Sequence, residues 1–146
     1  MYNLYQPLPL TKNQKLAYAS LLVYMTKANN NHKPQASSFV KKTINRLNIS
    51  QSDMAKVSCP STIDDLYKVT SLIQGHKLAV DLLHSLWFAV SLDDVITDAE
   101  IDSIRNVAHI LNINDDKVLA INHLVQDEIA FLKQTCEVLE ADEVRC

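Results

Sequence analysis

Four carboxylates lie close together in one short segment of the chain. Asp93, Asp94, Asp98 and Glu100 fall within eight residues. Hard cations such as Ca²⁺ and Mg²⁺ take several oxygen ligands from a confined loop, so these side chains are the candidate ligands of a divalent-cation site. The segment is not an EF-hand loop, because counting from Asp93 there is no Gly at the sixth position and no Glu at the twelfth.

The same acids also suit the start of a helix. Glu100 forms a capping box with Thr97, and Asp98 favours the positive end of the helix dipole. Helix capping alone and cation binding are therefore two interpretations of the same segment.

A second cluster carries the opposite charge and consists of Lys33, Lys41, Lys42 and Arg46. Residues 1–60 hold eight Lys or Arg and one acid, whereas residues 61–146 hold six Lys or Arg and sixteen acids, which gives charges of +7 and −10. Such a chain suits docking to an acidic partner protein or head-to-tail pairing with a second copy, which would form a homodimer. Pairing of the two charges inside the monomer is the alternative.

A nucleic-acid partner is disfavoured by charge and composition. The net charge is −3, and few aromatic side chains lie among the lysines. Surfaces that bind nucleic acids are usually basic overall and, for single strands, carry interleaved aromatic residues. We therefore expect other proteins as partners, bound through the basic N-terminal half.

The motifs of common enzymes are absent from the sequence. It has no GxSxG element and no glycine-rich phosphate loop, and its single glycine, Gly75, is typical of a helix end. His76, His84, His109 and His123 lack the i, i+4 spacing that places two histidines around a zinc ion on one helix. The sequence thus predicts a protein that is not an enzyme and needs no cofactor, apart from the Ca²⁺ or Mg²⁺ considered above.

Composition indicates one helical domain of 146 residues. One Gly and four Pro are too few for the tight turns of a sheet protein.

The longest apolar stretch, Leu82 to Leu92, is shorter than the ~20 residues that a membrane span requires, and the N-terminus does not resemble a secretory signal. Cys59, Cys136 and Cys146 are odd in number and widely spaced, which favours free thiols. We therefore expect a cytoplasmic protein without a membrane span.

Capping residues and apolar periodicity predict about seven helices. The predicted starts and ends are Thr11 with Gln14 to about Ala28, Pro34 to Asn48, Ser50 with Asp53 to before Pro60, Ser61 with Asp64 to before Gly75, His76 to Leu92, Thr97 with Glu100 to Leu111, and Asn114 to Val138. Residues 1–10 are expected to form an extended arm, and residues 140–146 a frayed acidic tail. The helix from His76 is apolar almost all round, so it should be the axis of the core, with Trp87 and Phe88 inside.

An internal repeat relates the two halves of the chain. An offset of 64 residues pairs Leu22 with Leu86, and it pairs Leu47-Asn48-Ile49 with Leu111-Asn112-Ile113. The prediction is a first half over residues 11–60, a connecting helix within residues 61–75 and a second half over residues 76–139. Packing one half against the other would bury the apolar face of each and produce pseudo-two-fold symmetry.

Particular residues of this repeat resemble the tellurite-resistance TerB-like family. They are Ala28-Asn29-Asn30, Leu92-Asp93-Asp94-Val95-Ile96-Thr97-Asp98-Ala99-Glu100, Arg46 to Ser50 and His109 to Asn114. The resemblance implies a compact all-helical domain with internal two-fold symmetry and acidic loops that bind divalent metal. The chain departs from the family pattern at Asp94, which replaces a Gly, and at Asn29 and Ala36, which replace the acids of the first loop.

Together these observations predict an all-α bundle that serves as a non-enzymatic protein-protein interaction module. The resemblance implies a bacterial cytoplasmic or membrane-associated complex in a stress-response, secretion or immunity context. The alternatives are a divalent-cation-binding stress protein that uses the loop from Asp93 to Glu100, and a small antitoxin or immunity protein that blocks a toxin through one charged face.

Overall fold

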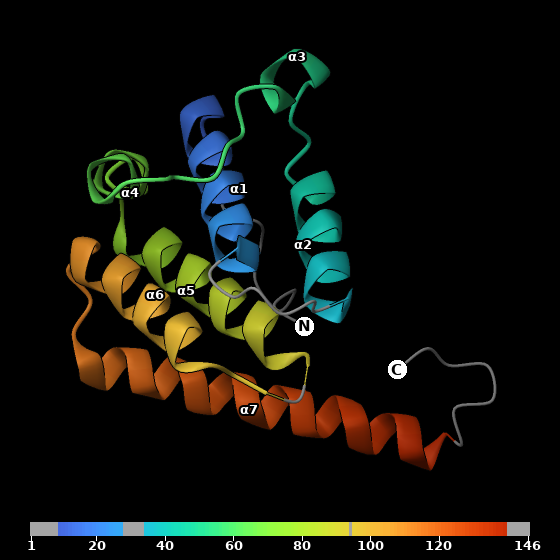
Figure 1. Cartoon of the computed structure of the whole chain (residues 1–146). Helices are drawn as coiled ribbons and strands as arrows, with labels where there is room; N and C mark the ends of the chain where they lie inside the picture. Colours follow the sequence, from blue (N-terminus) through green and yellow to red (C-terminus); the bar gives the residue numbers. More distant parts are fainter. Residues whose placement is uncertain (1–8, 28–33, 94, 140–146) are drawn as a thin grey trace.

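Seven α-helices, and no strand, make up the described part of the chain, residues 9–27, 34–93 and 95–139 of the computed structural model (Figure 1). They are α1 Lys12–Lys27, α2 Pro34–Arg46, α3 Gln51–Met54, α4 Ile63–Thr70, α5 His76–Ser91, α6 Asp98–Ile110 and α7 Asp115–Val138. The predicted all-helical class is confirmed. Lys33, Asp94, Cys146, the tail from residue 140 and the arm up to residue 8 lie outside the described residues.

Local capping sets where most helices begin. At α1 the Thr11 N–H donates to Gln14 Oε1 (2.9 Å) and the Gln14 N–H donates to Thr11 Oγ1 (3.2 Å). This reciprocal pair satisfies two N–H groups that have no partner inside the helix. The prediction for α4 is wrong by one residue, since Thr62 caps it by accepting from the Asp65 N–H (3.0 Å). Within α4, Leu66 is 3% exposed and faces the core.

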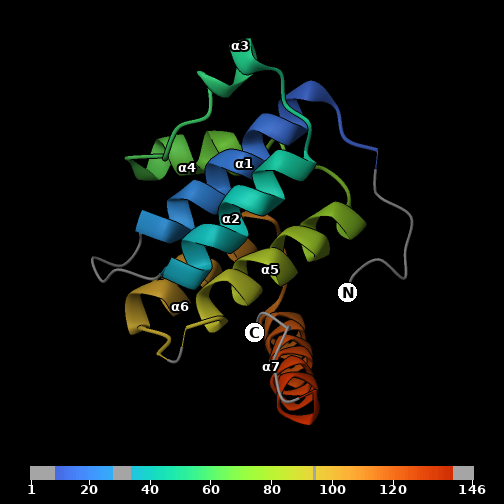
Figure 2. The same ribbon diagram turned by 90° about the vertical axis from the view of Figure 1, so that its right-hand side faces the viewer.

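Helix α5 is the axis of the core, as its composition predicts. It packs against α1, α2, α6 and α7, and Figures 1 and 2 show it between the α1–α2 pair and α7. Trp87 and Phe88 are buried, and the rings of Phe39 and Phe88 lie 5.0 Å apart between centroids. Burial of such side chains stabilises the fold by about 1.5–3 kcal/mol each, so no other helix contributes as much to the core.

The bounds of the helices recur at the spacing of the sequence repeat. The first and last residues of α1 and α5 are 64 positions apart, and so are those of α2 and α6. Asn48 and Asn112, with the same spacing, both have left-handed backbones (φ 58° and 60°) at the ends of α2 and α6. Asparagine tolerates this conformation better than most residues, which explains these helix ends. Two-fold superposition of the halves remains a prediction.

The predictions about a membrane span and about free thiols can be compared with the structure. In the described ranges, no helix combines the length and the apolar character that crossing a membrane demands. Cys59 has a free thiol, whereas Cys136 is disulfide-bonded, so the expectation of free thiols is wrong at Cys136. Spacing along the chain was a poor guide here because a disulfide depends on distance in space. The cytoplasmic location remains a prediction.

Candidate docking surface and the acidic loop

The exposed side of α2 is polar beyond its first residue, Pro34, and carries three cations. After Pro34 its exposed residues are Gln35, Ser38, Lys41, Lys42, Asn45 and Arg46. They lie on one side because residues three and four apart are neighbours on a helix surface. The opposite side of α2 packs into the core through Ala36 and Val40. The structure therefore brings three of the four predicted partner-binding residues together on a rigid helix, and Lys33 lies outside the described part.

These cations have no acidic neighbour on the helices that carry them. Neither α1 nor α2 contains an Asp or Glu, and α1 adds Lys12, Lys15 and Lys27. Within the described ranges, Lys41, Lys42 and Arg46 form no ion pair. The positive charge of α2 thus faces solvent, where it attracts anionic groups over about 8 Å at physiological salt.

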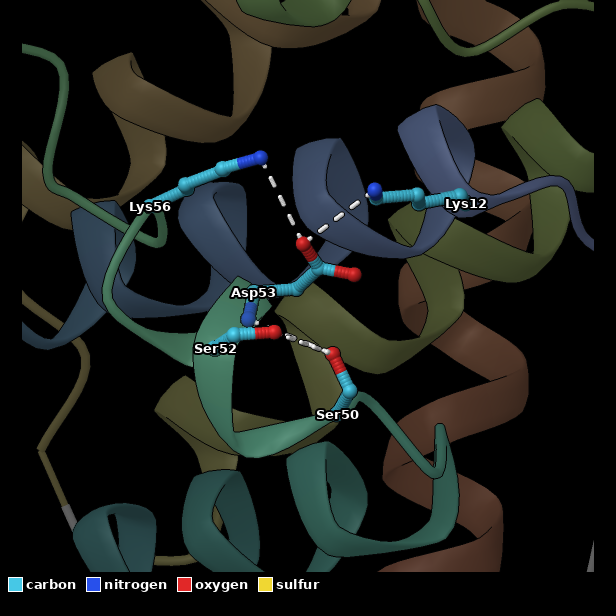
Figure 3. A network of polar contacts seen from close by, with 5 residues as sticks. All are labelled: Lys12, Ser50, Ser52, Asp53 and Lys56. Carbon is cyan, nitrogen blue, oxygen red and sulfur yellow. Dashed lines mark hydrogen bonds and ion pairs between the residues drawn. The ribbon is translucent and has the colours of Figure 1, made fainter.

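The single acid of the basic half, Asp53, is already engaged at one end of the helix pair (Figure 3). Its Oδ1 lies 3.3 Å from the Lys12 Nζ and 3.4 Å from the Lys56 Nζ. Partial burial raises the pKa of the Asp53 carboxyl, but the hydrogen bond from Ser50 and the two ammonium groups outweigh this effect, so the pKa lies below its ordinary value of 3.8. Asp53 consequently offsets the charge of Lys12 and Lys56.

The first carboxylate of the acidic loop, that of Asp93, contacts a helix in the other half of the chain. Asp93 Oδ2 accepts a hydrogen bond from the Ala36 N–H, with 3.3 Å between the heavy atoms. Ala36 lies in the first turn of α2, where backbone N–H groups lack helical partners and the dipole favours negative charge. The α5–α6 loop thereby caps α2, a contact between residues 57 positions apart.

The other acids of the loop lie around the start of α6. The Glu100 carboxylate accepts from the Thr97 N–H (2.9 Å) while the Glu100 N–H donates to Thr97 Oγ1 (3.2 Å), which confirms the predicted capping box. Glu100 is 2% exposed, whereas Asp98 is exposed. Among residues 9–27, 34–93 and 95–139, no three His, Cys, Asp or Glu side chains are grouped as a metal site would require. Since Asp94 is not among them, cation binding stays a prediction.

A buried polar cluster on α5 was not predicted from the sequence. The Tyr18 hydroxyl, from α1, lies 2.8 Å from Asp81 Oδ2 and 2.6 Å from Ser85 Oγ. On another side of α5, His84 Nε2 lies 2.5 Å from Glu128 Oε1 of α7. The i, i+4 pair Asp81 and Ser85 in a mostly apolar helix is the signal that could have revealed it. These bonds tie three helices together.

Burial dominates the electrostatics of Asp81. Desolvation raises the pKa of Asp81, and the hydrogen bond from Tyr18 and the nearby His84 only partly oppose it. Tyr18, His84 and Ser85 are 3%, 2% and 8% exposed. Because these groups are enclosed by packed helices, the cluster is suited to fixing helix positions and offers a substrate little access.

A cavity of about 420 Å³ lies between the α4–α5 connection and the end of α6. Its walls include Thr70, Ile73, His76 and Asn112, and they contain no carboxylate, ammonium or guanidinium group. Thr70 Oγ1 is buried and has no hydrogen-bond partner among the described residues. The cavity lacks the converging charged groups of a typical catalytic pocket.

Comparison of the chain with protein-family models, with curated proteins and with solved structures found no match.

Proposed function

We propose that this protein is a non-enzymatic interaction module that docks an acidic partner protein through the exposed side of α2. The observation that carries the proposal is the positive charge of Lys41, Lys42 and Arg46, which form no ion pair with any described residue, on a helix without acidic residues. A partner with a complementary negative patch would be steered toward this face and held in register by it.

The rigidity of the surface supports docking. Helix α2 packs against both α1 and α5, and its first turn is capped by Asp93. A preorganised face loses little conformational entropy on binding, which favours affinity. The TerB-like resemblance adds the proposed context, a bacterial complex in stress response, secretion or immunity.

A protein partner fits this face better than a nucleic acid. The exposed side of α2 has no aromatic side chain, and its one aromatic residue, Phe39, packs against Phe88. Stacking platforms for bases are therefore lacking there. The acidic second half of the chain, with sixteen Asp or Glu against six Lys or Arg, would also repel a long polyanion.

Charge reversal on α2 tests the proposal directly. The wild type and the double variant Lys41→Glu/Lys42→Glu are used as baits in affinity capture from native extract. In parallel, fluorescence anisotropy with labelled poly-glutamate at low salt measures attraction to a defined polyanion. We expect the wild type to retain a specific acidic protein and to bind poly-glutamate, and the double variant to lose both by at least tenfold.

A matched control comes from the opposite half of the chain. Lys68→Glu/Lys77→Glu makes the same change in net charge at two exposed positions on α4 and α5, so it should retain the partner. If both double variants lose binding equally, net charge and not the α2 face is responsible. Tighter binding of a DNA duplex than of poly-glutamate, abolished only by the α2 variant, would replace the proposal with a nucleic-acid function.

A further inference from the structure

Helix α7 is longer than the body that it packs against. Its buried residues, Val118, Ile121, Val125 and Ile129, face α5 and α6, and no later residue of α7 is buried. Figure 1 shows the C-terminal part of α7 projecting past α5 and α6. Two turns of helix beyond Ile129 therefore lie without cover from the described residues.

The exposed side of α7, from Leu124 through the projecting part, carries an apolar face. The exposed fractions are 52% for Leu124, 68% for Phe131, 45% for Leu132, 74% for Val138 and 53% for Leu139. Leu124, Phe131 and Val138 recur every seven residues, as do Leu132 and Leu139, so all five lie on one side of the helix. Two polar residues lie among these five on the same side: Glu128, which contacts His84, and Thr135, whose hydroxyl donates to the Phe131 carbonyl. The other side is formed by Gln126, Asp127, Ala130, Lys133, Gln134 and Glu137. We call the five apolar residues the α7 face.

We propose that the α7 face is covered by the α7 face of a second copy of this chain, in an antiparallel two-fold dimer. A fully covered Phe side chain buries roughly 150–250 Å² and Leu and Val bury less, so these five partly exposed side chains offer on the order of 500 Å² per copy. Two copies together bury about 1,000 Å², the area at which specific interfaces begin. A face that pairs with itself also closes the assembly at two copies.

The pattern of the face selects the antiparallel arrangement. The positions Leu124, Phe131, Leu132 and Leu139 are symmetric about the midpoint between Phe131 and Leu132. An antiparallel pair then brings Leu124 of one copy beside Leu139 of the other and the two Phe131 rings to the centre. A parallel pair would instead set Asp127 opposite Asp127 at the edge of the contact, and like charges in register destabilise such pairings.

This dimer is independent of the proposed function. It uses α7, whereas the proposed docking surface is the exposed side of α2, and both helices pack on α5 without being paired with each other. It also differs from head-to-tail pairing of the basic and acidic halves, because apolar contact carries it and its affinity should change little with salt.

Sedimentation velocity on the full chain tests the proposal. At about 200 µM, a concentration suited to an interface of this modest area, the wild type should sediment at twice the monomer mass. Phe131→Glu/Val138→Glu should sediment as a monomer with an unchanged circular-dichroism melting curve, since both side chains are exposed. The control Ile63→Glu/Tyr67→Glu makes the same change at two exposed apolar residues of α4 and should remain a dimer.

A charge swap tests the orientation. Leu124→Lys and Leu139→Glu should each weaken the dimer at least tenfold, and together they should restore it, because in the antiparallel pair the new lysine meets the new glutamate of the other copy. A monomeric wild type overturns the proposal and leaves another segment or another protein as the cover. A dimer that persists in Phe131→Glu/Val138→Glu, or that non-reducing gels show to be disulfide-linked, also overturns it.

Discussion

The Asp93 carboxylate accepts a hydrogen bond from the backbone N–H of Ala36, across 57 positions of sequence. The contact joins the loop after the central helix α5 to the first turn of α2, and so it links the acidic half of the chain to the helix that carries the candidate docking surface. The Asp93 carboxylate thereby acts as an N-cap of α2, although it comes from a different part of the chain.

Replacing Asp93 with Ala should lower the free energy of unfolding by about 1 kcal/mol, because the first turn of α2 loses its acceptor and its favourable charge. Urea denaturation measures the change. Asp102→Ala, at an exposed position within α6, should stay within about 0.5 kcal/mol of the wild type. If Ca²⁺ or Mg²⁺ raises the melting temperature of the wild type but not of Asp93→Ala, the Asp93 carboxylate binds an ion. Cation binding would then explain the acidic loop better than helix capping does.

Tyr18→Phe should destabilise the fold by about 1–3 kcal/mol, since it removes the hydroxyl that contacts both Asp81 and Ser85 and leaves their polar atoms without that partner. Thermal unfolding followed by circular dichroism reports the loss. Tyr67→Phe removes the same hydroxyl from an exposed residue of α4 and should be neutral. Equal effects of the two substitutions would show that the contacts of Tyr18 contribute nothing measurable.

As the pH rises, the wild type should become less stable than the variant Asp81→Asn. Burial raises the pKa of Asp81 above 3.8, so the folded state holds this proton more tightly than the unfolded chain. The resulting stabilisation is fully present below pH 3.8 and is lost as the pH rises through the raised pKa. Asn keeps an acceptor for Tyr18 and does not ionise.

Urea denaturation of both proteins between about pH 3.5 and pH 7 measures this difference. The stability of Asp81→Asn minus that of the wild type should increase over the acid range and then level off. A difference that is constant with pH would show that the Asp81 carboxyl titrates alike in the folded and unfolded chains.

Asn112 should tolerate Gly but not Ala. Its φ of 60° lies in the left-handed region, where a Cβ costs about 1–2 kcal/mol and Asn is better accommodated than Ala. We expect Asn112→Ala to lower the unfolding free energy by about 1 kcal/mol and Asn112→Gly to stay within about 0.5 kcal/mol of the wild type. Asn48, with φ 58°, should behave in the same way, and chemical denaturation of the four variants tests both positions.

Local chemistry in the sequence was enough to predict most helix bounds. The boxes of Thr11 with Gln14 and Thr97 with Glu100 mark helix starts because their partners are three residues apart and need no other part of the chain. The central position of α5 was equally predictable, since a helix that is apolar all round has to be enclosed. At α4 two adjacent hydroxyl residues, Ser61 and Thr62, were both candidates for the cap, and Thr62 forms it by accepting from the Asp65 N–H.

Tertiary packing decided which polar groups contact one another. Asp93 reaches Ala36, Tyr18 reaches Asp81 and His84 reaches Glu128 because helices distant in sequence meet, and no spacing rule along one helix specifies such contacts. Packing also decided that α7 is buried at Val125 and exposed at Leu132, although these residues are seven positions apart and lie on the same side of the helix. The sequence alone determined the helices and their apolar faces, since these depend on neighbours within a few residues; the folded structure determined which faces are covered, since burial depends on where each helix ends relative to the others.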